Sequence, residues 1–332
     1  MPATYRKLVA TKLTPHFREA AELREEPVPE PGPGEVRVRN RFAGVNATDV
    51  NVTAGRYSAD PELPMDLGAE AVGVVEAVGE GVERLKEGDA VATTSLGGGY
   101  REVQVVKARR AFPVPEASPE MLSILVSGIT ASIALDVVGE MGTGETVLVT
   151  AAAGGTGQYA VQLARRAGNR VFGTCGSKEK VALLRELGCD RPINYHEEGV
   201  RKVLKEECPD GVDLVYESVG RDLFDAAVDH LAVHGRLLAI GFVSEYVGGV
   251  EAVKSPRIYT RLLAKSASVR GFFLPHFAEH YQAHVLKLAG LLRSGELHVA
   301  IDETPFEGIE QVVDAVEHLH SGDSRGKVVV RL

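Results

Sequence analysis

The sequence of 332 residues has no tryptophan and only three cysteines, Cys175, Cys189 and Cys208, none of them in a C-x-x-C pair. An odd number of scattered cysteines argues against a disulfide scaffold or a cysteine-rich zinc site, and it favours a reducing compartment. The ten histidines show no paired spacing of the H-E-x-x-H type. We therefore predict no metal site and no catalytic triad built on them.

The sequence also lacks an apolar run near the roughly 20 residues that cross a bilayer, and it has no long apolar segment at its start. Thirty-seven basic residues against 46 acidic residues give a net charge of −9. An acidic chain is poorly suited to binding nucleic acid or an anionic membrane. With 44% apolar and 25% charged residues, the composition is that of a globular protein, and the length predicts two domains.

About the first 120 residues have the pattern of short strands separated by turns. The segment EVRVRNRFAGVN (35–46) alternates apolar and polar residues, and AVGVVEAVGEGV (71–82) and DAVATTS (89–95) predict further strands. The run PVPEPGPGE (27–35) predicts a surface turn, because proline cannot join the interior of a sheet. We predict a β-rich domain over residues 1–121.

The pattern then changes to alternating strands and helices. TVLVT (146–150) is a continuous apolar strand, and a helix is predicted over QYAVQLARRAG (158–168), after a run of glycines. Five more apolar strands follow: VFGTC (171–175), PINY (192–195), VDLVYE (212–217), RLLAIG (236–241) and ASVRGFF (267–273). Six such strands predict an α/β fold with a doubly wound parallel sheet of the Rossmann type over residues 122–274. Residues 275–332 are predicted to return to the first domain.

The turn between the first strand and helix of this sheet, AAAGGTG (151–157), is the strongest functional signal. Gly154 and Gly157 occupy the second and third glycine positions of a G-x-G-x-x-G fingerprint, and Ala152 replaces the first. The second glycine lets the backbone approach a pyrophosphate, and the third permits close helix packing. We predict a dinucleotide site formed by Gly154, Gly155, Thr156 and Gly157. A tight turn without a ligand is the alternative.

The residues after the second strand indicate which dinucleotide binds. An NAD enzyme carries an acidic residue about 20 residues past the glycines, where it bonds the ribose 2′-hydroxyl. Here the sequence is CGSKEK (175–180), in which Glu179 is the one discordant charge. A hydroxyl and two ammonium groups suit a 2′-phosphate, so we predict NADP(H), bound by Gly176, Ser177 and Lys180. An ordinary solvated start of a helix is the alternative.

Several segments together resemble the medium-chain dehydrogenase/reductase superfamily: PGPGEVRVRNRFAGVNATDVN, LGAEAVGVVEAVG and AAAGGTGQYAVQLA. More narrowly, GRYSAD, LVSGITA, LGCDRPINY, YESVG and SVRGFFL resemble the prostaglandin reductases of its quinone-oxidoreductase-like branch. The resemblance covers nearly the whole chain. It implies a GroES-like first domain, a Rossmann domain that binds NADP(H), and a homodimer, which the edge strand ASVRGFF could form by pairing with its symmetry mate.

The resemblance also bears on zinc. Zinc-dependent relatives need a cysteine where this chain has Asn46 and a histidine where it has Ala69, so that Glu70 alone remains. A zinc ion needs three or four ligands, and the four-cysteine lobe of the zinc enzymes is absent as well. We predict no catalytic zinc and no other metal.

Without a Lewis acid, reduction of a carbon–carbon double bond conjugated to a carbonyl group remains feasible. The resemblance implies small hydrophobic enones, such as 15-oxo-prostaglandins reduced at the 13–14 double bond. The residues alone indicate an NADPH-dependent reductase or a quinone oxidoreductase. A catalytically idle NADPH-binding protein, structural or regulatory, is the alternative from another functional class.

Two residues of the first domain are candidate catalytic groups. Tyr57, in GRY, is the preferred proton donor or hydrogen-bond donor to the developing enolate, with a packed surface tyrosine as the alternative. Asn46 stands at the position of the zinc cysteine, and the resemblance implies that its amide faces the nicotinamide. It could equally bond its own loop backbone.

The remaining expected cofactor contacts lie at strand ends and in loops, as the resemblance and the geometry of a doubly wound sheet imply. They are Thr130, Tyr195, Ser218, Ile240, Tyr246, Phe272, Phe273, Leu274 and Ser324. Ser324 stands where the family has asparagine, and Thr130 and Tyr195 could instead serve packing. The final residues VVRL are not an S-K-L signal, so we expect a cytoplasmic protein, with the peroxisome as the location that the resemblance suggests instead.

Overall fold

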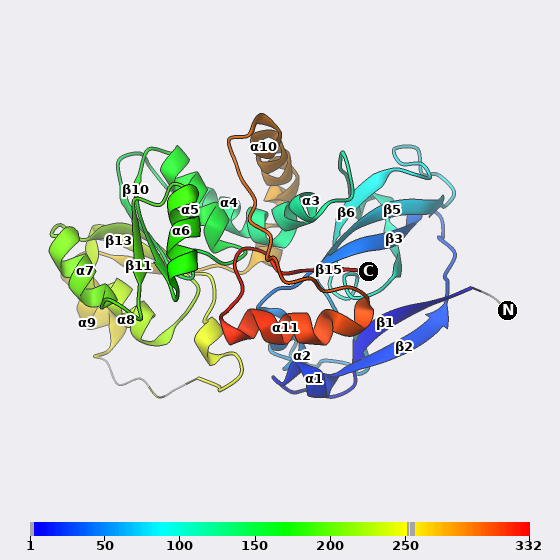
Figure 1. Ribbon diagram of the computed structural model, residues 1–332, viewed down its shortest axis with the longest axis horizontal. Coiled ribbons are helices and arrows are strands. Elements are labelled where there is room, and N and C mark those ends of the chain that lie inside the picture. Colours follow the sequence, from blue (N-terminus) through cyan, green and yellow to red (C-terminus); the bar gives the residue numbers. More distant parts are fainter. Residues whose placement is uncertain (1–2, 251, 253–255) are drawn as a thin grey trace. The chain divides into compact units, whose positions relative to one another are not determined.

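The computed structural model describes residues 3–250, 252 and 256–332. The chain forms two compact units (Figure 1). The first unit comprises Met1–Val126 and Ile301–Leu332, and the second comprises Ser127–Ala300.

The first unit contains two antiparallel sheets. The smaller has the order β2-β1-β4, formed by Ala21–Pro27, Thr4–Ala10 and Met65–Asp66. The larger has the order β15-β3-β5-β6-β8, and β7 also pairs with β3. In that order its strands are Val329–Arg331, Glu35–Gly44, Glu70–Val78, Ala90–Thr94, Ala111–Pro113 and, for β7, Val103–Lys107. The last strand of the chain, β15, therefore pairs with β3 in the larger sheet of the first unit.

The apolar and polar residues that alternate in the sequence 35–46 alternate between buried and partly exposed positions along β3. Val36 and Val38 are fully buried and pack with Val75 and Val91, whereas the residues between them are partly exposed. The helices of this unit are short: α1 (Phe17–Ala20), α2 (Asp49–Thr53), η1 (Ala108–Arg110), α3 (Pro119–Ser123), η6 (Ile309–Gln311) and α11 (Val312–Ser321).

The second unit is built on one parallel sheet with the strand order β11-β10-β9-β12-β13-β14. The strands are Arg191–Asn194, Arg170–Cys175, Thr146–Val149, Val212–Glu217, Leu231–Ala239 and Ser268–Gly271. This is the strand order of a doubly wound sheet. Its first strand, β9, lies in the middle, the next two strands lie on one side of it, and the last three lie on the other side. The predicted six-stranded α/β fold is confirmed. β14 lies at the edge, and its pairing with a second copy stays a prediction.

The helices of the second unit are η2 (Ile124–Ile129), α4 (Thr130–Ile133), η3 (Ala134–Val138), α5 (Gly157–Arg166), α6 (Lys178–Glu186), α7 (Val200–Glu207), α8 (Arg221–Asp229), η4 (Val243–Glu245), α9 (Ile258–Leu263), η5 (Leu274–His280) and α10 (Tyr281–Ser294). Helices η2, α4 and η3 precede β9, and from β9 onward every strand of the second unit is followed by one or two helices. η2 begins in the first unit, at Ile124. α5 ends just before Gly168, whose φ of 82° forms a left-handed turn that terminates the helix.

The helix α10 belongs to the second unit, although residues from 275 onward were predicted to return to the first domain. Side-chain contacts explain the difference. The His284 ring lies 2.7 Å from the Ser132 hydroxyl, and Lys287 pairs with Asp136 at 2.5 Å, so α10 is attached to α4 and η3. The return to the first unit begins at Ile301, and the first crossover follows Val126 rather than residue 121.

The expectation that no apolar run approaches 20 residues was wrong for one segment. Pro119–Val138 is continuously helical over 20 residues, with a mean hydropathy of 2.0 in its most apolar window. Serine, glycine and threonine residues interrupt the run and hide it in the sequence. By length and composition it could span a membrane, but 72% of that window is buried inside the protein, as in a core helix.

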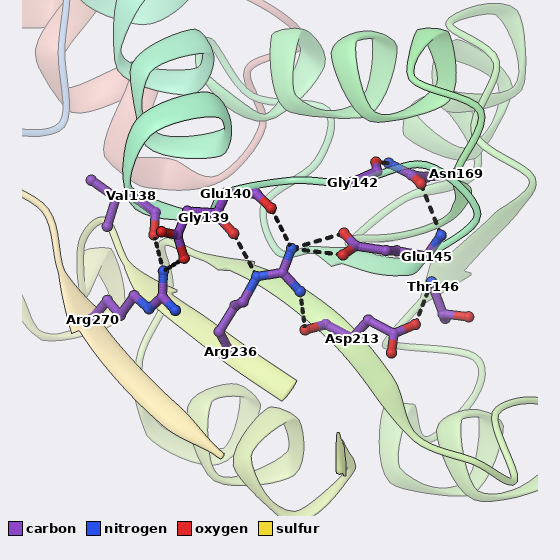
Figure 2. A network of polar contacts seen from close by, with 10 residues as sticks. All are labelled: Val138, Gly139, Glu140, Gly142, Glu145, Thr146, Asn169, Asp213, Arg236 and Arg270. Carbon is purple, nitrogen blue, oxygen red and sulfur yellow. Dashed lines mark hydrogen bonds and ion pairs between the residues drawn. The ribbon is translucent and has the colours of Figure 1, made fainter. Parts of the chain in front are cut away.

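Arg236, in β13, forms hydrogen bonds with several segments at the amino-terminal edge of the parallel sheet (Figure 2). Its guanidinium donates to the carbonyl oxygens of Gly139 (2.5 Å), Glu140 (3.1 Å) and Asp213 (3.1 Å), and to both oxygens of Glu145 (2.8 and 2.9 Å). All the donors in this group of contacts come from one side chain that is only 11% exposed.

We expect Arg236→Met to lower the free energy of unfolding by about 2–3 kcal/mol, because it leaves a half-buried carboxylate and carbonyl groups without donors. Arg165→Met is the matched control, since Arg165 is 53% exposed and makes one ion pair, to Asp190 at 3.5 Å. The control should cost less than about 1 kcal/mol. Urea unfolding followed by circular dichroism would check this, and equal losses would contradict the role of the network.

Candidate functional site

The glycine turn lies at the carboxyl end of β9, where ligands bind doubly wound sheets. A Cβ atom on Gly157 would lie 2.3 Å from the Ala151 carbonyl oxygen, so only glycine allows α5 to begin this close to β9. A Cβ atom on Gly154 would meet one atom, the same oxygen, at 3.2 Å. Gly157 therefore permits close packing of α5 against β9, and Gly154 leaves its backbone accessible on one side.

The alanine at the first glycine position is accommodated by its neighbour strand. Ala152 is fully buried, and its N–H donates to the Thr174 carbonyl oxygen of β10 at 3.0 Å. A Cβ atom on Gly173 would lie 2.9 Å from the Ala152 Cβ, so the space that Ala152 fills is the space that Gly173 leaves. The substitution is thus compensated within the sheet.

Two buried hydroxyl groups on the strands beside β9 have no partner within the described part of the chain. They are Thr174 Oγ1, near the end of β10, and Ser218 Oγ, directly after β12. A buried polar group without a hydrogen bond costs about 1–3 kcal/mol. Unpaired hydroxyls at this edge, together with the open backbone of Gly154, fit a polar ligand such as the pyrophosphate and ribose of a dinucleotide.

The residues predicted to hold a 2′-phosphate meet at the ends of β10 and β11. Ser177 caps α6 by accepting a hydrogen bond from the Lys180 N–H at 3.3 Å. A Cβ atom on Gly176 would lie 2.6 Å from the Tyr195 hydroxyl, which therefore covers this glycine. Lys178 forms an exposed ion pair with Glu197 at 3.6 Å. This contact agrees with the alternative interpretation, in which the segment is an ordinary helix start exposed to solvent.

A buried carboxylate that sequence analysis missed organises the turn after β12. Glu217 is 1% exposed, and it accepts hydrogen bonds from the N–H groups of Val219 and Gly220 and from the Thr150 hydroxyl. Burial raises its pKa, and these donors partly offset the effect. The Thr150 hydroxyl also accepts from the Ser218 N–H at 2.8 Å. Only the position of Glu217 at a strand end could have indicated this.

Ile240 and Tyr246, which were predicted to contact the cofactor, both follow β13 but have different surroundings. The Ile240 N–H donates to the Glu217 carbonyl oxygen at 2.8 Å, which keeps Ile240 beside β12. Tyr246 is only 6% exposed and packs edge-on against Phe242, with ring centroids 4.8 Å apart. Its hydroxyl lies 2.8 Å from the Cβ position of Gly241. Tyr246 is therefore a buried support of this loop.

The segment after β14 is aromatic. Phe272 is 8% exposed and stacks on Phe277 with ring centroids 5.0 Å apart, whereas Phe273 is 37% exposed. The Leu274 carbonyl oxygen accepts a hydrogen bond from Tyr281 at 3.0 Å. Thr130 is buried in α4 of the same unit, and Ser324 lies in the terminal turn of the first unit.

The first unit contains a buried polar cluster around Glu70, at the start of β5. Glu70 is fully buried, and one carboxylate oxygen accepts from Lys327 Nζ at 2.5 Å and from Asn46 Nδ2 at 2.9 Å. The other oxygen accepts from the Val126 N–H at 2.8 Å. Lys327 Nζ also donates to Asn46 Oδ1 at 2.7 Å. This lysine is 1% exposed, so the pair is a buried ion pair.

The partners of Asn46 fix the orientation of its amide. Its Nδ2 donates to Glu70 and to the Gly44 carbonyl oxygen at 3.2 Å, and its Oδ1 accepts from Lys327. Both hydrogens of the amide nitrogen are thus engaged, and direct donation to a substrate would break one of these bonds. The contact with Gly44 agrees with the alternative of an asparagine that bonds its own loop. A catalytic role for Asn46 stays a prediction.

Tyr57 lies on the segment that follows α2 and is 43% exposed. Its hydroxyl oxygen accepts from Asn51 Nδ2 at 3.0 Å and lies 2.5 Å from the Thr48 hydroxyl. Either oxygen of the Thr48–Tyr57 pair could be the donor. Tyr57 is thus accessible, and Asn51 holds its oxygen in place, which keeps it a candidate proton donor.

The donors of this cluster do not fit a zinc ion. Among the described residues, no group of three or more histidine, cysteine, aspartate or glutamate side chains could hold a metal. Asn46 and Glu70 are both bound to the Lys327 ammonium, which places a cation of the chain between them. Ala69, at the other position where zinc-dependent relatives carry a ligand, has no donor in its side chain.

Comparisons with known proteins agree with this geometry. The alcohol dehydrogenase GroES-like domain matches residues 32–116, and the zinc-binding dehydrogenase domain matches residues 155–290. Prostaglandin reductase-3 of Mus musculus is 49% identical over 100% of this chain and 90% of its own length. A probable quinone oxidoreductase of Leishmania amazonensis is 43% identical over 100% of this chain and 99% of its own. The structure of Escherichia coli quinone oxidoreductase complexed with NADPH covers 98% of this chain and 100% of its own, at 30% identity and a TM-score of 0.86.

The pH dependence of stability should report on Asp49, which contacts this cluster. Burial raises the pKa of its carboxyl from 3.8 to about 7, although donation by Tyr100 and by the Asn46 N–H lowers it. Between these pH values the folded state holds a proton that the unfolded state has lost. The stabilisation is complete below pH 4 and is lost as pH rises through 7, by at most about 1.4 kcal/mol per pH unit.

Urea unfolding of the native protein and Asp49→Asn at several pH values would measure this. The free-energy difference between the two should change steadily with pH, with the native protein losing its advantage as pH rises. A difference that is constant with pH would show that the Asp49 pKa is not raised.

Proposed function

Since the chain belongs to the medium-chain dehydrogenase/reductase superfamily, we propose that it is an NADPH-dependent reductase of the carbon–carbon double bond of α,β-unsaturated ketones. The observation that carries the proposal is the glycine turn at the carboxyl end of β9, where Gly157 allows α5 to begin close to the strand and Gly154 leaves its backbone accessible. An exposed tyrosine, Tyr57, in the first unit supports it. The 49% identity to prostaglandin reductase-3 supports 15-oxo-prostaglandins or similar small hydrophobic enones as substrates.

The second unit supplies the residues that would hold NADPH. The backbone at Gly154 and the start of α5 suit the pyrophosphate, and the Ser218 hydroxyl, which has no partner among the described residues, would bind a polar group of the cofactor. Ser177 and Tyr195, at the ends of β10 and β11, would contact the adenosine phosphate. When bound, NADPH would supply the hydride for the electron-poor β-carbon of the enone.

Tyr57 would act on the substrate oxygen. As the β-carbon accepts the hydride, negative charge develops on the carbonyl oxygen, and a hydroxyl directed at that oxygen stabilises the charge. Thr48 and Asn51 hold the phenolic oxygen in place, and from this position Tyr57 would donate its proton to the enolate. A proton from solvent or from Tyr57 then completes the reduction at the α-carbon.

A quinone reductase is the second candidate, favoured by the 43% identity to a probable quinone oxidoreductase. Quinones contain the same conjugated carbonyl group, so the same residues would serve. Steady-state NADPH consumption with matched panels of enones and quinones separates the candidates. We expect turnover of enones, unchanged after extensive chelation with EDTA because the donors around Glu70 bind an ammonium.

Failure of this test has a distinct meaning for each outcome. Faster turnover of quinones would assign the alternative activity. Thermal stabilisation by NADPH without turnover of any compound would make the protein an idle NADPH-binding protein. Loss of activity together with about one zinc per chain would overturn the argument made from Asn46, Ala69 and Glu70.

Tyr57→Phe tests the proposed proton donor. Loss of one such donor costs on the order of 10²-fold in turnover, and protonation by solvent could reduce the loss to about tenfold. KM should change less than kcat, because the ground-state carbonyl is a weaker acceptor than the enolate. Tyr259→Phe is the matched control, since Tyr259 is 63% exposed on α9, in the other unit.

NADPH affinity, measured by fluorescence titration, should be the same in both tyrosine variants. Unchanged turnover in Tyr57→Phe would make Tyr57 a surface residue without a role in the reaction. Lost NADPH affinity would show that the substitution disturbs the fold around it.

A further inference from the structure

A path of hydrogen bonds joins the terminal segment of the chain to Tyr57. It starts at Lys327, whose ammonium is 1% exposed and lies between Glu70 Oε1 (2.5 Å) and Asn46 Oδ1 (2.7 Å). A buried ammonium has a large desolvation cost, which only close pairing offsets. The position of Asn46 is thus set by a charge that cannot move to solvent.

The next step runs from Asn46 to α2. The Asn46 N–H donates to Asp49 Oδ2 at 2.8 Å, and the Asp49 N–H donates back to the Asn46 carbonyl oxygen at 3.0 Å. The same carboxylate accepts from the buried Tyr100 hydroxyl. Asp49 is the first residue of α2, a helix of five residues that is too short to be stable alone. The helix therefore depends on this anchor.

The last step runs from α2 to the candidate proton donor. Asn51, on α2, donates to the Tyr57 hydroxyl at 3.0 Å and accepts from the Arg56 guanidinium at 2.6 Å. Thr48, which precedes α2, contacts the same hydroxyl at 2.5 Å. The Tyr57 oxygen is thus held from both ends of the helix's first turn.

We propose that Lys327 is a positioning residue: its ammonium fixes Asn46 and Glu70, and through α2 it fixes the Tyr57 hydroxyl. The proposal rests on the reductase function proposed above. Lys327 is too deeply buried to touch a substrate, so it acts through Tyr57 and not on the reacting atoms.

Lys327→Met tests the proposal in a double-mutant cycle with Tyr57→Phe. Methionine keeps much of the apolar stem and removes the charge. We expect kcat to fall about 10–100-fold with little change in NADPH affinity, as for a misplaced reacting group. In the Tyr57→Phe background the same change should cost less than about twofold, because the group that Lys327 positions is already gone.

Lys107→Met is the matched control. Lys107 lies in the same unit, is 54% exposed and pairs with Glu35 at 3.0 Å. It should leave kcat unchanged in both backgrounds. If Lys327→Met costs the same factor with and without the Tyr57 hydroxyl, Lys327 acts on general stability or on another group, and the proposal is overturned.

Two further variants cover a failure of Lys327→Met to fold. Glu70→Gln combined with Lys327→Met removes both charges and so leaves none buried alone. Lys327→Ala opens a space that ethylammonium could enter, and we expect it to restore kcat saturably, whereas sodium at equal ionic strength should not. Absence of rescue in a folded Lys327→Ala protein counts against a role for the charge at this place.

A readout without turnover separates this proposal from the proposed function. In protein labelled with carbon-13 at the tyrosine ring, the Tyr57 signal is identified by its loss in Tyr57→Phe. Lys327→Met should shift or broaden that signal, and Lys107→Met should not. An inactive native protein with this shift would refute the reductase function alone. An active protein without it would refute the positioning role alone.

Discussion

The buried ion pair between Lys327 and Glu70 is the contact on which the candidate catalytic segment depends. Each partner alone would be a buried charge that costs several kcal/mol, and each compensates the charge of the other. Asn46 is bound to both, and its amide cannot rotate without placing a donor against the ammonium. The loop that carries Thr48, Asn51 and Tyr57 begins from this fixed point.

The amino-terminal and carboxyl-terminal edges of the parallel sheet differ in whether their buried polar groups are paired. At the amino-terminal edge, Arg236 uses its donors on the carbonyl groups and the carboxylate around it (Figure 2). At the carboxyl-terminal edge, the buried hydroxyls of Thr174 and Ser218 have no partner in the part of the chain that the structure describes. A satisfied network adds rigidity where no ligand is expected. Unpaired groups at the other edge are a cost that a bound dinucleotide would remove.

The local features of the fold could be predicted from the sequence because their signals lie within a few residues. The alternation in β3, the apolar strand of β9 and the glycines before α5 each report on their own segment. The attachment of α10 could not be predicted, since it depends on His284 meeting Ser132, which lies 152 positions earlier. The apolar helix Pro119–Val138 was missed because polar residues that are buried in its interior, such as Ser127, read as interruptions.

Sequence could indicate the local geometry around the candidate site, such as the close packing at Gly157, whereas the cofactor role of Ser177 stays a prediction. The Lys327–Asn46 contact joins residues 281 positions apart, and no periodicity connects them. Sequence alone could state that the ligands for zinc are missing, but not that an ammonium binds the remaining carboxylate. That difference has chemical weight. An ammonium offers hydrogen-bond donors but no vacant coordination position, so it can orient Asn46 and compensate Glu70 without polarising a substrate oxygen as a Lewis acid does. In the reduction proposed above, the hydrogen bond to the developing enolate would then come from an accessible group, and Tyr57, which is exposed and whose oxygen contacts Thr48 and Asn51, is our candidate.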